Sequence, residues 1–131
     1  MIVAGIGCRR NSPSEAIVSA IEVALAACGL ERSALGAIAT AADKAAEPGL
    51  LRVAEDWNLP LVVVSEHQMK DVSGAALTKS ARVHALKGVS SVAETAALAA
   101  VGRTARLMGA RVTNAHAACA IAIGDGPGDA S

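Results

Sequence analysis

The chain has 131 residues, of which 53% are hydrophobic and 1% aromatic, with one Trp and neither Tyr nor Phe. This length suits one domain, and a mean hydropathy of +0.43 with 18% charged residues excludes a disordered chain. Twelve Lys and Arg balance twelve Asp and Glu. Because the chain has no net basic charge and only one aromatic residue for base stacking, we expect no nucleic-acid partner.

The three cysteines, Cys8, Cys28 and Cys119, are widely spaced and form no C-x-x-C pair. Their pattern indicates neither a disulfide framework nor a zinc site. No basic segment precedes the first apolar run, and no apolar run approaches the roughly 20 residues of a membrane span. We therefore expect a reduced, cytoplasmic domain with no membrane contact.

The first strand and helix have clear start signals. Residues 2–6 form a short, partly β-branched apolar run that is ended by Gly7, and this run predicts a buried strand. A capping box follows, with Ser12 as N-cap, Pro13 at N1 and Glu15 at N3. The predicted helix carries an apolar stripe and ends at a glycine, with the pattern Ile17, Ile21, Ala24, Cys28 and Gly29.

Two more strands and a helix follow. Residues 37–41 are a plausible second strand, and Leu50, Ala54 and Trp57 share one face of a second helix. Pro60 ends that helix, and residues 61–64 form the clearest strand of the sequence. Alternating strands and helices predict an α/β unit with parallel strands.

The second half is less regular. A capping box at residues 65–68 predicts a short helix that ends at 71–74, and a second helix is predicted at 78–85. A loop at 88–91 leads into an Ala-rich helix that continues to about Val101. Closing strands are predicted at 111–113 and 118–123. The order and direction of the closing strands do not follow from the sequence. We expect one three-layer α/β/α domain over residues 1–124, with an open, mostly parallel (mixed) sheet, and a flexible tail over 125–131.

The turn after the first strand is a candidate anion site. In an open α/β sheet, ligands gather at the carboxyl ends of the strands, and a helix N-terminus favours phosphate or carboxylate. Arg9 and Arg10 supply forked donors for such an anion, and Gly7, Cys8 and Asn11 complete the turn. The alternative is a tight turn with two solvated arginines. The dinucleotide fingerprint needs a third glycine, and Arg10 stands there.

Possible chemistry falls on two residues. Cys8 is a candidate thiolate beside a helix start and Arg9, or else a small buried thiol. After the second strand, Thr40 and Lys44 belong to the same sheet edge; Lys44 is either an anion contact or a solvated charge. Glu47 is either an acid–base group or a helix cap.

The remaining candidates are hydroxyls and histidines. The spacing of Ser91 and Glu94 is explained by a capping box, whereas Ser90 is a candidate donor to a ligand. The histidines, His67, His84 and His116, show no metal-ligand spacing. We expect no metal bound by the protein itself and no cofactor.

Three ordered motifs resemble the CobE and CbiG C-terminal domain family of cobalamin biosynthesis. They are G-I-G-C-R-R at residues 5–10, A-T at 39–40 with K-x-x-E-P-G-L at 44–50, and S-x-x-V at 80–83 with G-V-x-S-V-A-E-x-A-A-L at 88–98. The resemblance covers residues 2 to 101. Asn11 stands where the family commonly has Gly, Ala42 where it often has an acidic residue, and residues 113–116 differ from its closing pattern.

The resemblance implies a role in building the corrin ring. Its two-domain members open the lactone of a cobalt-precorrin-5 intermediate with loss of a two-carbon aldehyde, and this chain resembles their C-terminal half. It implies a precorrin or cobalt-precorrin ligand, whose acetates and propionates would suit Arg9, Arg10 and Lys44. Any cobalt would belong to that substrate, and Glu47 is the candidate base for lactone opening. Two alternatives remain: a small nucleotide- or phosphate-binding α/β protein, and a non-catalytic partner of another corrin-pathway enzyme.

Overall fold

A computed structural model describes residues 1–65, 67–68, 92–102, 105–109 and 111–124. The described strands form one six-stranded mixed sheet in the order β3-β2-β1-β6-β4, with β5 also paired to β6. The strands are β1 (Ile2–Cys8), β2 (Ala37–Ala41), β3 (Leu61–Val64), β4 (Arg106–Leu107), β5 (Val112–Thr113) and β6 (Ala117–Ile123).

The direction of the strands divides the sheet at β6. β1, β2 and β3 are parallel, with Val3 opposite Ala37 and Ile38 opposite Leu61. β6 is antiparallel to β1, and both β4 and β5 are antiparallel to β6. β6 therefore runs against all the other described strands, which confirms the expectation of an open, mixed, mostly parallel sheet.

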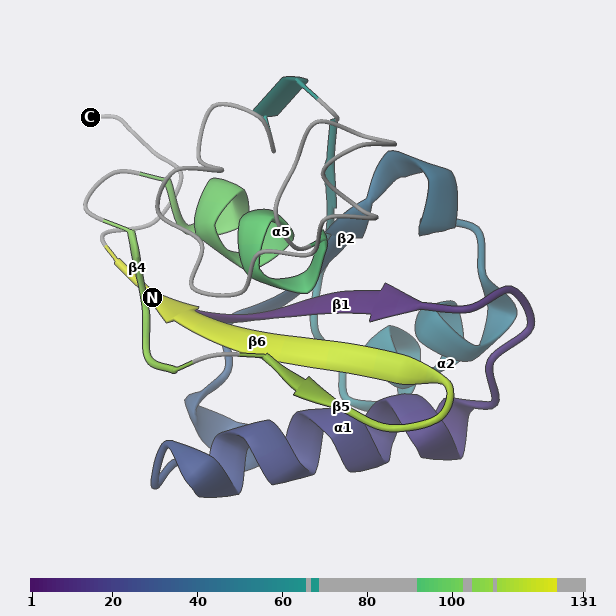
Figure 1. The fold of residues 1–131 in the computed structure, drawn as a ribbon, viewed down its shortest axis with the longest axis horizontal. Coiled ribbons are helices and arrows are strands. Elements are labelled where there is room, and N and C mark those ends of the chain that lie inside the picture. Colours follow the sequence, from purple (N-terminus) through teal and green to yellow (C-terminus); the bar gives the residue numbers. More distant parts are fainter. Residues whose placement is uncertain (66, 69–91, 103–104, 110, 125–131) are drawn as a thin grey trace.

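Helices cover both faces of the sheet, so the domain has three layers (Figure 1). α1 (Ser14–Ala27) and α2 (Pro48–Asp56) pack on one face and α5 (Val92–Val101) on the other. Short 3-10 turns η1 (Arg32–Ala34) and η2 (Ala42–Lys44) flank β2. One core cluster lies on the α1 and α2 side and a second beneath α5.

The face of α5 that packs on the sheet is rich in alanine. Ala93, Ala96, Ala97 and Ala100 are all buried. A Cβ added to Gly5 of β1 would clash with the carbonyl oxygen of Ala93 and lie 2.6 Å from the amide nitrogen of Ala97. Small side chains on both partners therefore let the helix backbone come unusually close to the strand.

The expected elements of the first half are confirmed, with differences at their ends. β1 extends two residues beyond the predicted run, whereas β2 and β3 have the predicted bounds. Gly29 has the positive φ of +70° expected just past the end of α1. Trp57 is half-buried at the C-cap of α2, and the Arg32 guanidinium lies 4.0 Å from its ring centroid.

The capping box predicted at α1 is wrong. Pro13 is in an extended conformation and itself forms the N-cap, so the helix begins at Ser14 without a side-chain cap. The box at residues 65–68 is confirmed: the Ser65 amide donates to Gln68 Oε1 at 2.9 Å, and the Gln68 amide donates to Ser65 Oγ at 3.1 Å.

Several expected elements lie outside the described residues. They are the segment 71–74, the helix at 78–85, the loop at 88–91 with Ser90 and Ser91, and the tail at 125–131. The sequence missed β4, which has two residues.

Candidate functional site

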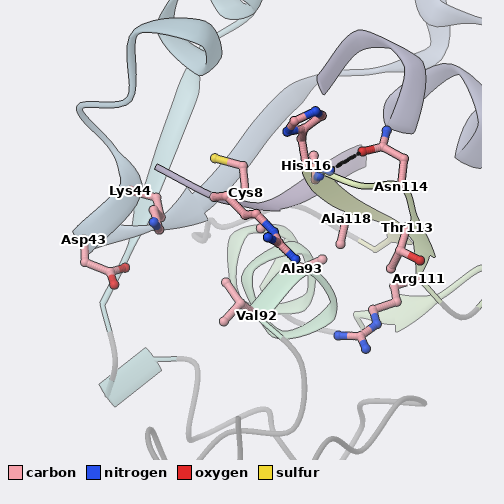
Figure 2. A pocket seen from close by; sticks show the side chains of 13 residues that line it. Cys8, Asp43, Lys44, Val92, Ala93, Arg111, Thr113, Asn114, His116 and Ala118 are labelled. Carbon is pink, nitrogen blue, oxygen red and sulfur yellow. Dashed lines mark hydrogen bonds between the residues drawn. The ribbon is translucent and has the colours of Figure 1, made fainter. Parts of the chain in front are cut away.

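A cleft of about 570 Å³ opens at the carboxyl edge of β1 (Figure 2). Four segments line it: the end of β1, the turn η2, the start of α5, and the chain around the β5–β6 turn. The lining residues are Gly7, Cys8, Arg9, Asp43, Lys44, Val92, Ala93, Arg111, Thr113, Asn114, His116, Ala117 and Ala118. This volume lies within the usual range for small-molecule sites, about 300–1,000 Å³.

The topology explains why these segments meet. Cys8 at the end of β1 is opposite Ala117 at the start of β6, because these two central strands are antiparallel. α5 starts at the same edge, with the Val92 side chain next to Gly7. The β5–β6 turn and the first turn of α5 therefore lie beside the carboxyl end of β1.

Three cations surround the cleft: Arg9, Lys44 and Arg111. Figure 2 shows Lys44 and Arg111 on opposite sides of the start of α5. None of the three forms an ion pair with a carboxylate in the described part of the chain, whereas Asp43 adds one carboxylate to the lining. The start of α5 also brings the positive end of a helix dipole to the cleft. The arrangement favours an anionic ligand.

The β1–α1 loop is hydrogen-bonded to the β5–β6 turn. The Arg9 amide donates to the His116 carbonyl oxygen at 2.9 Å. The Ser12 hydroxyl lies 2.7 Å from the Arg9 carbonyl oxygen and 3.0 Å from that of His116. Ser12 therefore joins two walls of the cleft instead of capping α1.

The other end of this loop is held by Glu47. The Asn11 amide donates to Glu47 Oε1 at 2.7 Å, and Glu47 is the N-cap residue of α2. Asn11 has a φ of +60°, a left-handed conformation that Asn and Gly tolerate better than other residues. Arg10, Asn11 and Glu47 are not among the cleft lining. The Glu47 carboxylate thus connects two loops and is not set against the cleft as a base.

Cys8 does line the cleft, but its surroundings disfavour a thiolate. Burial raises the pKa of this thiol, the negative charges of Glu47 and Asp43 raise it further, and Lys44 opposes them. Cys8 is therefore protonated at neutral pH and contributes a small apolar surface. The raised pKa runs against the expected activation of this thiol.

Two residues of the sequence motifs have structural roles. Thr40 is fully buried, and its hydroxyl donates to the Ile6 carbonyl oxygen at 2.9 Å, so its side chain does not reach the cleft. Gly5 is required by the close packing of α5, and Gly7 alone of the two glycines lines the cleft. The predicted ligand contacts that the cleft retains are Gly7, Cys8, Arg9 and Lys44.

Sequence reasoning missed the wall formed by residues 111–118. Arg111 and His116 lie in this wall. Asn114 Oδ1 shapes the turn, because it accepts hydrogen bonds from the amides of His116 and Ala117 at 2.9 Å each. The Asn114 side chain also donates to the Ala16 carbonyl oxygen of α1 at 2.9 Å. This wall reaches the cleft because the last strand pairs antiparallel with the first, and the sequence carries no signal for that pairing.

The described ranges contain neither a metal-binding group nor a membrane-spanning helix. No group of three or more His, Cys, Asp or Glu side chains there could hold a metal ion. None of the helices found there is long and apolar enough to cross a membrane.

The family described as "Cobalamin synthesis G C-terminus" matches residues 2–122. The chain belongs to this family. It is 32% identical over 121 residues to the protein CobE of Sinorhizobium sp., a match that covers 92% of this chain and 79% of that protein. It is thus a member of the CobE and CbiG C-terminal group of cobalamin biosynthesis proteins, as its motifs predict.

Solved structures of the family have the same fold. A CobE from the cobalamin (vitamin B12) biosynthetic pathway superposes with a TM-score of 0.86 at 34% identity, covering 93% of this chain and 89% of that one. The cobalamin biosynthesis protein chiG of Agrobacterium tumefaciens gives 0.75 at 36% identity, with 95% and 98% covered. A putative cobalamin biosynthesis protein G homolog from Sulfolobus solfataricus gives 0.70 at 25% identity, and the match spans 92% of this chain but 36% of that longer protein.

Proposed function

We propose that this chain binds a carboxylate-rich corrin-ring intermediate, a precorrin or cobalt-precorrin, in the cleft at the carboxyl edge of β1. The observation that carries this proposal is the set of three cations, Arg9, Lys44 and Arg111, around a cleft that belongs to a cobalamin biosynthesis protein. A cytoplasmic location remains part of the proposal.

The chemistry of the lining fits such a ligand. Guanidinium groups bind carboxylates through paired, charge-assisted hydrogen bonds, and the ring carries acetate and propionate groups at its rim. The lining between the cations is small and apolar, with Cys8, Val92, Ala93 and Ala118. With no aromatic side chain in this lining, we propose that the ligand is held at its rim and not by stacking on its face.

We propose binding, and not lactone opening by Cys8 or Glu47. The raised pKa of Cys8 removes its thiolate, and the Glu47 carboxylate is bonded to the Asn11 amide outside the cleft. A binding protein of this kind would present the intermediate to another enzyme of the pathway. The longer Sulfolobus solfataricus homolog, in which the match spans 36% of the chain, supports a role beside further protein.

Titration with two corrins tests the proposal. Cobyrinic acid carries free carboxylic acids, whereas in cyanocobalamin the side chains of a corrin ring are amidated. We expect binding of the first, weakening as salt rises, and little binding of the second, measured by calorimetry and by corrin absorbance.

Variants locate the site. Because hydrogen bonds to charged groups contribute about 1.5–3 kcal/mol, Arg9→Ala and Arg111→Ala should each weaken binding by about tenfold or more. Arg52→Ala is the matched control, since Arg52 is exposed on α2 and lies 3.6 Å from Asp56. Equal affinity for both corrins, or stabilisation by nucleotides instead, would refute the proposal.

A further inference from the structure

Two buried polar side chains hold the backbone of residues that line the cleft. Among the described residues, the buried polar or charged ones are Ser12, Thr40, Glu94 and Thr95. Two of them, Ser12 and Glu94, bond to the backbone of residues that bring a guanidinium to the cleft. Neither side chain is part of the cleft lining.

Ser12 fixes the backbone at Arg9. It is 5% exposed, and its hydroxyl lies 2.7 Å from the Arg9 carbonyl oxygen and 3.0 Å from that of His116. The Arg9 amide donates to the same His116 oxygen at 2.9 Å. Both backbone polar groups of Arg9 are thereby held, and the loop is tied to the start of β6.

Glu94 holds the backbone at Arg111 through its amide. It lies in the first turn of α5 and is fully buried, and its Oε2 accepts the Arg111 amide at 3.0 Å. This bond ties the segment before β5 to the helix whose start lines the cleft. A buried carboxyl side chain needs hydrogen-bond partners, and the Arg111 amide is one partner of Glu94.

We propose that Ser12 and Glu94 are positioning residues that set the spacing between the guanidinium groups of Arg9 and Arg111. This inference rests on the proposed function, because the proposed ligand is a rigid ring that carries the carboxylates bound by the two arginines. A macrocycle presents its carboxylates at fixed separations, so cations on a fixed backbone lose less conformational freedom on binding than mobile ones.

Amide hydrogen exchange of the unliganded protein tests the anchors without any ligand. Glu94→Ala should speed exchange of the Arg111 amide by about tenfold and leave the Arg9 amide unchanged. Ser12→Ala should speed exchange at Arg9 by about fivefold and leave Arg111 unchanged. Ser19→Ala, at an exposed serine of α1, is the control. Wild-type exchange at both amides in both variants would overturn the inference.

Binding of cobyrinic acid then tests the consequence by double-mutant cycles. Ser12→Ala should weaken binding about fivefold in the wild-type and Arg111→Ala backgrounds, but less than about twofold in Arg9→Ala. Glu94→Ala should show the reverse dependence, losing its effect only in Arg111→Ala. An equal loss in both backgrounds would mean general destabilisation and would overturn the inference.

Two further outcomes are separated by design. If Glu94→Ala does not fold, the Ser12 cycle decides alone, and Glu94→Gln, which keeps a side-chain oxygen for the Arg111 amide, should keep its protection within about twofold of wild type. If the wild-type chain does not bind cobyrinic acid while the exchange results hold, the proposed function fails and the anchoring of the two arginine backbones stands.

Discussion

Replacing Gly5 by Ala should destabilise the domain strongly, because β1 and α5 leave no room for a methyl group. The added Cβ would clash with the Ala93 carbonyl oxygen and lie 2.6 Å from the Ala97 amide nitrogen and 2.7 Å from the Ala97 Cβ. Two of these three atoms are helix backbone and cannot rotate away. Overpacking usually costs about 1–3 kcal/mol, and we expect a value near the top of this range, about 3 kcal/mol.

Thermal and urea denaturation of Gly5→Ala beside Gly7→Ala gives the measurement. Gly7 is the matched control on the same strand, since its added Cβ would meet nothing nearer than 3.6 Å. At about 3–4 °C per kcal/mol for a domain of this size, the midpoint of Gly5→Ala should fall by about 10 °C. A difference between the two variants below about 0.5 kcal/mol would refute the close packing of α5 on β1.

Three further predictions concern Cys8, Thr40 and Arg32. Burial and the negative charges of nearby carboxylates raise the pKa of Cys8, so its thiolate fraction at neutral pH is low. Iodoacetamide should therefore alkylate Cys8 more slowly than it alkylates the cysteine of an unstructured peptide. Equal rates would contradict this. Thr40→Val should lower the free energy of unfolding by about 1 kcal/mol, through loss of the bond to the Ile6 carbonyl, and leave corrin affinity unchanged; weakened binding would return Thr40 to the site. Arg32→Ala should change the free energy of unfolding by less than about 1 kcal/mol, since the ion pair of Arg32 with Glu22 is half-exposed. The same variant should shift the fluorescence of Trp57, the single aromatic residue, because the Arg32 guanidinium lies over its ring. Unchanged emission would argue against this contact.

The parallel half of the fold follows from the sequence because its signals are local. A strand such as residues 61–64 is a continuous apolar run, β-branched at three of its four positions and bounded by Pro60, and it has the predicted limits. The antiparallel half depends on pairing between distant segments. The closing strands predicted at 111–113 and 118–123 are confirmed as β5 and β6, but their pairing did not follow from the sequence. β4 was missed because its two residues are too few for a periodic pattern, and it is a strand only through its pairing with β6.

The candidate site was predicted in part for the same reason. Arg9 and Lys44 follow strands of the parallel half, so their common edge could be deduced. Arg111 reaches the cleft through the direction of β6, which no local pattern encodes. Ser12 shows a second limit: its spacing suits a helix cap, but the carbonyl oxygens of Arg9 and His116 compete for the same hydroxyl.

The position of β6 between β1 and β4 also determines when the cleft forms during folding. Ile2 pairs with Ile123, so the centre of the sheet closes only when segments from distant parts of the chain meet. Loop closure of this length is slow, and the local β1-β2-β3 unit can assemble before it. A nascent chain that ends before β6 would contain Arg9, Lys44 and Arg111, but β5 would have no β6 to pair with, so Arg111 would not be held beside the other two cations. Its first strand would also have an open edge prone to aggregation. The complete cleft and the covered edge of β1 are thus acquired in the same late step.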